Sequence, residues 1–196
     1  MLRNTLTASL LLTAALGTAQ AGVINVVSLD TSGLIGQGTY YADFQFTSPN
    51  GNNTVTLSQL NFNPGSSYVL PSQPGAFFSE VLVPFTPGPL LTFRMEFETN
   101  PLVVKFPDQF SFYLSDAQQN ALETADPLGT NALVLVNLTA NGPAVTAFEG
   151  SGEALQSTPA VTSAVPEPAL SVVLGLSLAG IGAVRSRARR RSGRDG

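Results

Sequence analysis

The stretch Leu90–Glu98, with the sequence LLTFRMEFE, decides the fold class of this 196-residue chain. Large apolar residues fall at every second position, and the positions between them are polar or charged. Side chains that alternate in this way point to opposite faces of a β-strand, so one face is expected to enter a core and the other to meet solvent. The apolar face contains Leu91, Phe93, Met95 and Phe97, and the polar face contains Thr92, Arg94, Glu96 and Glu98.

Similar short runs recur along the chain between Gly, Pro and Asn residues that favour turns. No segment between residues 22 and 164 keeps a helical period, and Asp116–Ala125 is the only candidate for a helical turn. Short strands at this spacing predict an all-β fold, an antiparallel β-sandwich or a jelly roll, with the twelve Phe residues in its core. The other expected strands are Val23–Leu29, Thr39–Phe46, Thr54–Phe62, Phe77–Phe85, Phe110–Leu114 and Leu133–Leu138.

The composition excludes several classes of protein. The chain has no Cys, no His and no Trp, which rules out Ser-His-Asp and Cys-His catalysis, disulfides and structural zinc sites built on thiolates or imidazoles. Between residues 22 and 165 there are two basic residues and eleven acidic ones, a formal charge of −9. Such an acidic body repels phosphates, so no nucleic-acid partner is expected.

The N-terminal residues 1–21 have the pattern of a secretory signal peptide. Arg3 supplies the positive charge, Leu6–Leu16 is an apolar stretch, and the small residues Ala19 and Ala21 fit a signal-peptidase site. We expect cleavage after Ala21, and a body that begins at residue 22.

The C-terminal end contains three segments in a fixed order. Val165, Pro166, Glu167 and Pro168 come first, and the uncharged stretch 169–184 follows. Its 16 residues span about 24 Å as a helix, slightly less than a bilayer core, and flanking arginines can extend the span by snorkelling. Residues 185–194 form an Arg-rich tail that is expected to stay in the cytoplasm. Its membrane-flanking basic residues are Arg185, Arg187, Arg189, Arg190 and Arg191.

This ordered set over residues 165–191 resembles the PEP-CTERM sorting signal of Gram-negative bacteria. The resemblance implies that an exosortase recognises the Pro-Glu-Pro motif, and that the protein belongs to a host that makes exopolysaccharide and biofilm. The protein would be anchored transiently in the inner membrane with its body in the periplasm, and would then reach the cell surface or the medium. Asp30–Gly36 and Pro107–Phe112 resemble, more loosely, short secreted PEP-CTERM proteins of unknown activity.

The resulting organisation is a signal helix, a β-sandwich body over residues 22–149, a flexible stalk and a transmembrane helix. The stalk is predicted for residues 150–164, which are rich in Gly, Ser, Thr, Ala and Pro. Signal peptidase, exosortase and the inner membrane are the expected partners, and extracellular polysaccharide is a further candidate.

Three functions remain open for the body. The first is a non-enzymatic surface or matrix protein without catalytic residues, and the second is a carbohydrate-binding module that stacks sugars on Tyr side chains. The third is a glycan hydrolase that uses Glu96 and Glu98, whose carboxylates would lie about 6–7 Å apart on one strand face. No cofactor is expected, except that calcium could bind loop carboxylates. The candidate tyrosines are Tyr40, Tyr41, Tyr68 and Tyr113, and the candidate calcium ligands are Asp30, Asp108, Asp116 and Asp126.

Overall fold

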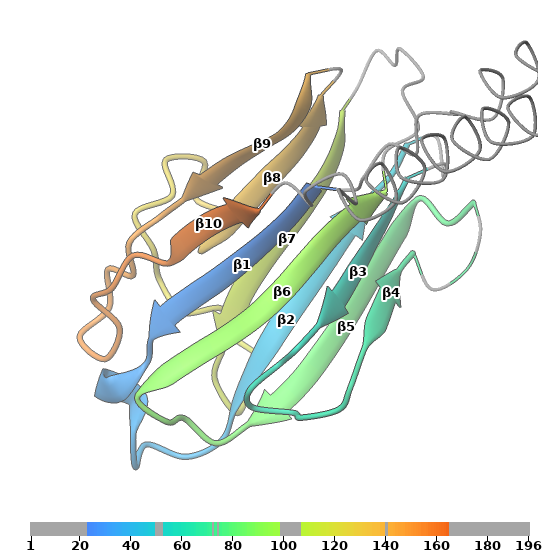
Figure 1. Ribbon diagram of the computed structural model, residues 1–196. Coiled ribbons are helices and arrows are strands. Elements are labelled where there is room, and N and C mark those ends of the chain that lie inside the picture. The colour runs from blue at the N-terminus through green and yellow to red at the C-terminus, as the bar shows by residue number, and fades with distance from the viewer. Residues whose placement is uncertain are drawn as a thin grey trace, which may run out of the picture.

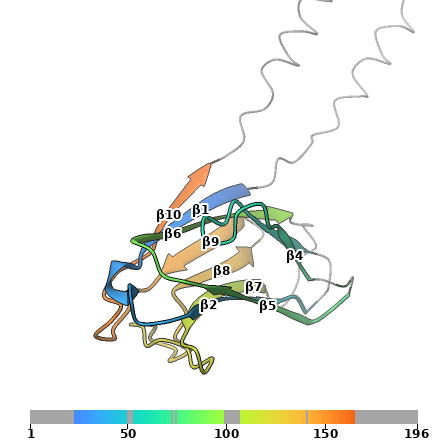
Figure 2. The same ribbon diagram turned by 90° about the horizontal axis from the view of Figure 1, so that it is seen from below.

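The computed structural model describes residues 23–49, 53–71, 73, 75–98, 107–139 and 141–164. These residues form two five-stranded antiparallel sheets that pack face to face (Figures 1 and 2). The predicted all-β antiparallel sandwich is confirmed. The expected signal and transmembrane helices lie outside the described residues. None of the described residues belongs to a helix with the length and the apolar character that a membrane span requires.

Sheet A is built around the alternating stretch that predicts the fold. Its strands are β1 (Val23–Asp30), β3 (Thr54–Ser58), β4 (Tyr68–Leu70), β6 (Leu90–Glu98) and β10 (Ala160–Ala164), in the order β10-β1-β6-β3-β4. The central strand β6 buries every second side chain, from Leu91 to Phe97, and turns the residues between them outward. The predicted alternation is therefore confirmed over the whole strand.

Sheet B covers the other side of the core. Its strands are β2 (Tyr40–Thr47), β5 (Phe78–Phe85), β7 (Asp108–Ser115), β8 (Val134–Thr139) and β9 (Gly142–Ala147), in the order β5-β2-β7-β8-β9. β9 occupies a segment that is not among the expected strands. It begins at Gly142 and includes Pro143, which a sheet tolerates here because β9 is an edge strand.

The core between the sheets is dominated by phenylalanine rings. The ring of Phe44 on β2 lies with its centroid 5.0 Å from that of Phe93 on β6 and 5.3 Å from that of Phe112 on β7. Such ring pairs contribute about 0.5–1.5 kcal/mol each beyond the burial of their area. Phe77 and Phe78 are exceptions to the expected Phe core, because both are exposed at the start of the edge strand β5. The fully buried rings are Phe44, Phe46, Phe93, Phe97, Phe110 and Phe112.

Two local expectations need correction. The strand predicted for Thr54–Phe62 ends at Ser58, because Gln59 adopts a φ of 53° and returns Leu60 to the core. Asp116–Ala125 contains hydrogen-bonded turns and no helical turn. The one helix of the described part is a single 3-10 turn, Ser32–Leu34.

Residues 150–164 belong to the sandwich, which corrects the predicted flexible stalk and moves the end of the body from residue 149 to Ala164. β10 pairs with β1 over five residues, and Leu155 is buried in the core. A Cβ atom at Gly33 would collide with the carbonyl oxygen of Ala154, so this segment packs closely on the loop after β1. Its small residues give it the composition of a linker. It nevertheless belongs to the fold, because Leu155 packs in the core and β10 pairs with the backbone groups along the edge of β1.

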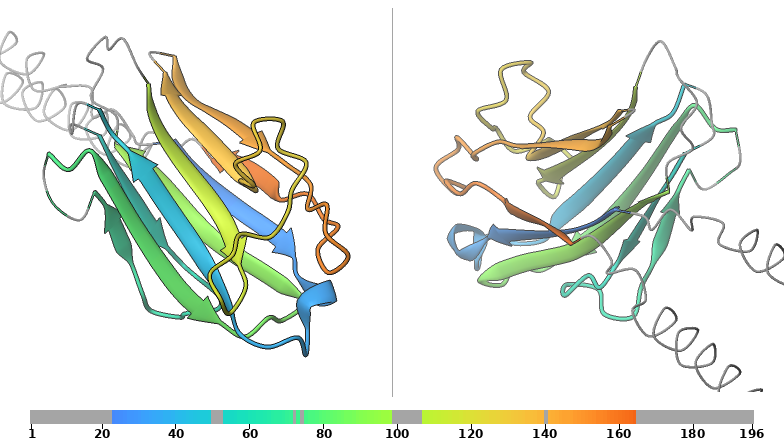
Figure 3. Two further views of the ribbon diagram at one scale, coloured as in Figure 1. Left: turned by 180° about the vertical axis from the view of Figure 1, so that it is seen from behind. Right: turned by 45° about the horizontal axis from the view of Figure 1, so that its top comes forward.

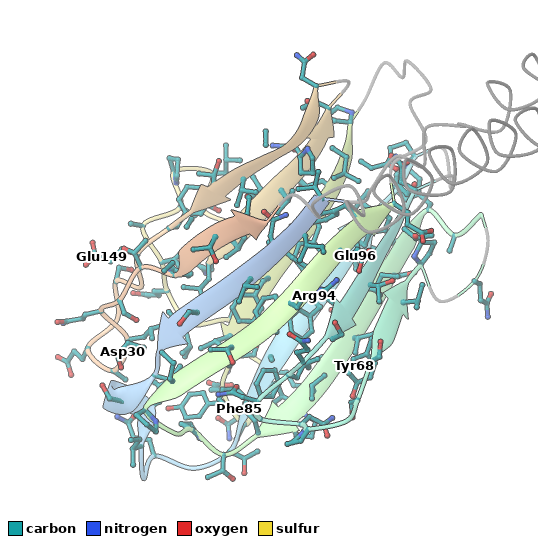
Figure 4. The ribbon with its side chains drawn as sticks, in the orientation of Figure 1. Asp30, Tyr68, Phe85, Arg94, Glu96 and Glu149 are labelled. Atoms are coloured by element: carbon teal, nitrogen blue, oxygen red, sulfur yellow. The ribbon has the colours of Figure 1, made fainter. Side chains whose placement is uncertain are left out.

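The first and last described residues lie side by side at one end of the sandwich. β1 and β10 are antiparallel neighbours, and Ile24 pairs with Ala164 (Figure 2). The loops 31–39, 116–133 and 148–159 lie at the opposite end, joined by bonds such as that from the Ser157 hydroxyl to the Asp30 carbonyl. Figure 4 shows Asp30 and Glu149 at that end. The acidic residues of this distal end are Asp30, Asp116, Glu123, Asp126, Glu149 and Glu153.

Candidate functional site

The two glutamates considered for glycan hydrolysis lie on the outer face of sheet A. A guanidinium N–H of Arg94 donates to Glu96 Oε2 at 2.9 Å, and this ion pair is partly exposed (Figure 4). Glu98 is exposed at the end of β6 and accepts a hydrogen bond of 3.2 Å from the Thr54 hydroxyl. One carboxylate is neutralised by its cation and the other is solvated, which is the arrangement of an ordinary outer strand face.

The four tyrosines do not form one platform. Tyr40 is buried, packs against Phe85 with ring centroids 6.4 Å apart, and donates to Gln37 Oε1 at 3.3 Å. Tyr68 is half-buried on β4 of sheet A and accepts a 3.0 Å hydrogen bond from the Asn63 side chain (Figure 4). Tyr41 and Tyr113 are half-buried and share the outer face of sheet B. Only this last pair presents two rings on one surface.

The aspartates considered as calcium ligands each serve a separate structural role. Asp30 and Asp116 accept hydrogen bonds from backbone N–H groups of their own turns, as Asx turns do. Asp126 accepts bonds from the backbone and hydroxyl of Thr130. Asp108 is fully buried and accepts bonds of 2.7 Å from Ser48 and from Asn53. Within the described ranges, no group of three or more His, Cys, Asp or Glu residues is placed to hold a metal ion.

The structure draws attention to an aspartate that sequence reasoning did not single out. β2 turns Tyr40, Ala42, Phe44 and Phe46 into the core, so Asp43 faces outward, yet it is only 7% exposed. Its Oδ2 accepts a 2.9 Å hydrogen bond from Gln45 Nε2, while Oδ1 is buried and has no hydrogen-bond partner among the described residues.

The cross-strand neighbours of Asp43 are set by the register of sheet B. Tyr113 lies directly opposite on β7, and Leu82 lies directly opposite on β5. Gln45 Nε2 also donates to Glu80 Oε1 at 3.1 Å, so one amide links two carboxylates. We call the outward residues Tyr41, Asp43, Gln45, Glu80, Leu82 and Tyr113 the Asp43 face; it lies on the surface of sheet B seen in the left view of Figure 3.

Burial makes the Asp43 carboxyl group a weaker acid than an ordinary aspartate. The pKa of Asp43 is raised to about 6, chiefly by desolvation, with a smaller contribution from the nearby charge of Glu80 and against the effect of the hydrogen bond from Gln45. The folded chain therefore holds this proton more tightly than the unfolded chain does. The stability that comes from the protonated form is fully present below the ordinary pKa of 3.8 and is lost as the pH rises to about 6.

We predict that Asp43→Asn removes a pH dependence of stability between pH 4 and 6. Over this range the free energy of unfolding of the native chain is expected to fall by about 2 kcal/mol as Asp43 ionises inside the fold, whereas the asparagine of the variant cannot ionise and contributes no such fall. Urea unfolding of both proteins at pH 4, 5, 6 and 7 measures the difference. If the free energy of unfolding changes with pH in the same way in both proteins, the raised pKa does not belong to Asp43.

The turn aspartates do not interfere with this comparison. Hydrogen bonds from Ser32 lower the pKa of Asp30, and those from Asn120 and Gln118 lower the pKa of Asp116. Burial acts to raise the pKa of Asp126, but hydrogen bonds from Thr130 and neighbouring backbone groups lower it overall. Stability from these three groups is lost only as the pH falls below their ordinary range, and equally in both proteins.

The sequence-predicted processing residues are not part of this surface. The signal-peptidase residues Ala19 and Ala21, the Pro-Glu-Pro motif and the Arg-rich tail all lie outside the described residues. Comparisons with known protein families, curated proteins and solved structures find no match to this chain.

Proposed function

We propose that this chain is an exported cell-surface or extracellular-matrix protein, sorted by an exosortase through its C-terminal signal and without enzymatic activity. In this proposal a signal helix precedes the sandwich and a transmembrane helix over residues 169–184 follows it. The motif Val165-Pro166-Glu167-Pro168 is then a substrate sequence that the exosortase recognises. The β-sandwich is the part that remains outside the cell.

The observation that carries the proposal is the position of the two body ends. Ile24 pairs with Ala164, so the segments that lead to the signal peptide and to the sorting signal leave the sandwich from the same end. One membrane surface can therefore hold both segments during export without bending or unfolding the sandwich. A body whose ends emerged on opposite sides would need a longer connection to meet the same membrane.

The charge distribution supports the same orientation. Six of the eleven body acids lie in the distal end, away from the start of β1 and the end of β10. The surface of a membrane with anionic lipids is negatively charged, and its potential falls off within a Debye length. A body held by its opposite end keeps these acids away from that surface.

Deleting residues 165–196 is expected to release the body into the periplasm or the medium. The full chain is expected in the inner membrane of a host without exosortase, and at the surface or in the medium of a host that has the enzyme. Fractionation followed by detection with an antibody against the sandwich measures all three cases.

The matched control keeps the tail and carries Glu149→Gln in an exposed distal loop, and it should fractionate like the native chain. Retention of the deleted chain at the inner membrane would overturn the proposal, as would recovery of the full chain from the cytosol.

A further inference from the structure

The free oxygen of Asp43 lies in the middle of a sheet face and not in the core between the sheets. Buried polar atoms nearly always have a hydrogen-bond partner, and a buried acceptor without one costs about 1–3 kcal/mol, more when it is charged. Asp43 Oδ1 is such an atom, since Gln45 bonds only to Oδ2. A ligand that donates a proton to Oδ1 would remove this cost.

Two tyrosines flank Asp43 on the outer face of sheet B. Tyr113 is the direct cross-strand partner of Asp43, and Tyr41 lies two residues earlier on the same face of β2. Directly opposite residues in antiparallel strands have Cβ atoms about 4.5–5.5 Å apart, so the side chains of Tyr113 and Asp43 leave the sheet next to each other. The face of an aromatic ring attracts a cation, with an energy of about 0.5–2 kcal/mol.

The charge of the Asp43 face is negative. Glu80 is held beside Asp43 through Gln45 Nε2, which donates to both carboxylates. Among the described residues Arg94 is the only basic side chain, and it lies on the outer face of sheet A with Glu96 as its partner. No protein cation therefore neutralises this face within the described part of the chain.

We propose that the Asp43 face binds an organic ammonium group. On binding, the side chains that cover Asp43 Oδ1 turn aside, an N–H of the ligand donates to this oxygen, and the carbon stem packs against Tyr41 and Tyr113. Carboxylate oxygens supply the ion pair, the rings supply a surface for the methylene or methyl groups, and Glu80 adds a second negative charge at the edge. A neutral sugar could stack on the rings but would leave the buried charge unpaired. The site is independent of how the chain is sorted.

The test is titration of the full chain, purified in mild detergent at pH 7.5, with three probes. These are propylammonium, a glucosamine trisaccharide with free amines, and its fully N-acetylated counterpart. Binding is followed by calorimetry and by tyrosine emission, which is unobscured because the chain has no Trp. We expect the free-amine trisaccharide, propylammonium or both to bind at least tenfold more tightly than the acetylated trisaccharide.

The variants test which side chains carry the binding. Asp43→Asn is expected to weaken amine binding at least tenfold, Tyr113→Leu about three- to tenfold and Glu80→Gln about two- to threefold. Glu96→Gln, which removes a carboxylate from the other sheet, should bind like the native chain. Circular dichroism confirms that each variant is folded, and the exposed Glu80 provides a second carboxylate variant that does not disturb a buried position.

Each outcome decides the proposal. Binding of propylammonium identifies a small amine as sufficient, and binding of the free-amine trisaccharide alone identifies an amino-sugar chain as the source of the ammonium group. Equal binding of the acetylated trisaccharide, unchanged amine binding in Asp43→Asn, or no binding of either amine at millimolar concentration would overturn the proposal.

Discussion

A chain that runs from residue 22 to Glu149 is expected to be largely unfolded, whereas a chain from residue 22 to Ala164 is expected to fold cooperatively. The shorter chain lacks Leu155, whose buried side chain fills part of the core. Losing a buried leucine side chain costs about 2–5 kcal/mol. The shorter chain also lacks β10 and leaves β1 as an unpaired edge.

The hydrogen bonds lost with this segment add to the effect. Backbone bonds join Ser151 to Glu123 and Gly150 to Ser157, and β10 pairs with β1 over five residues. At about 0.5–1.5 kcal/mol for each bond, the total loss approaches the 5–15 kcal/mol that stabilises a typical domain.

Urea unfolding followed by circular dichroism measures the difference between the two chains. A third chain that ends at residue 159 keeps Leu155 but lacks β10, and an intermediate stability is expected for it. If all three chains unfold at the same urea concentration, residues 150–164 contribute nothing to the fold and behave as the stalk that their composition predicts.

Phe44→Ala is expected to destabilise the sandwich by about 3–5 kcal/mol. Phe44 is fully buried on the central part of β2 and contacts Phe93 across the core as well as Phe110 and Phe112 on the neighbouring strand. Removing the ring leaves a cavity between the two sheets and breaks three ring contacts at once.

The matched control for this prediction is Phe78→Ala on β5. Phe78 is 49% exposed, so its removal is expected to cost less than about 1 kcal/mol. Thermal or urea unfolding of both variants measures the two losses. Equal destabilisation by the two substitutions would contradict the placement of Phe44 at the centre of the core.

The sequence was sufficient to predict those strands in which burial of one face makes apolar and polar residues alternate. The alternation over Leu90–Glu98 predicts both the strand and the face of every side chain in it, because one face of β6 meets the core and the other meets solvent. The same holds for Phe110, Phe112 and Leu114, which are all buried. When every second residue of a strand is buried, the apolar residues recur at every second position of its sequence.

The sequence was insufficient where a strand is made from small residues. β10 and β9 contain few large side chains and lie at sheet edges, so pairing of backbone groups stabilises them more than side-chain burial does. Such pairing depends on the position of a distant strand, and β1 lies more than a hundred residues before β10. Only the three-dimensional arrangement identifies these segments.

The Asp43 face could not be predicted from the sequence, although the sequence of β2 contains one sign of it. A single carboxylate interrupts the aromatic run of β2, at a position whose alternation points away from the core. That it is buried there depends on β5 and β7, which bring Leu82 and Tyr113 to its two sides. The pairing register of three strands cannot be read from one of them.

Intact-mass spectrometry of the protein recovered from its native host tests export and sorting most directly. We predict a chain that begins at Gly22 and has lost the segment beyond the Pro-Glu-Pro motif, with or without a group attached at the new end. Recovery of the whole 20.4 kDa chain from the cytosol, with both termini untrimmed, would contradict this assignment.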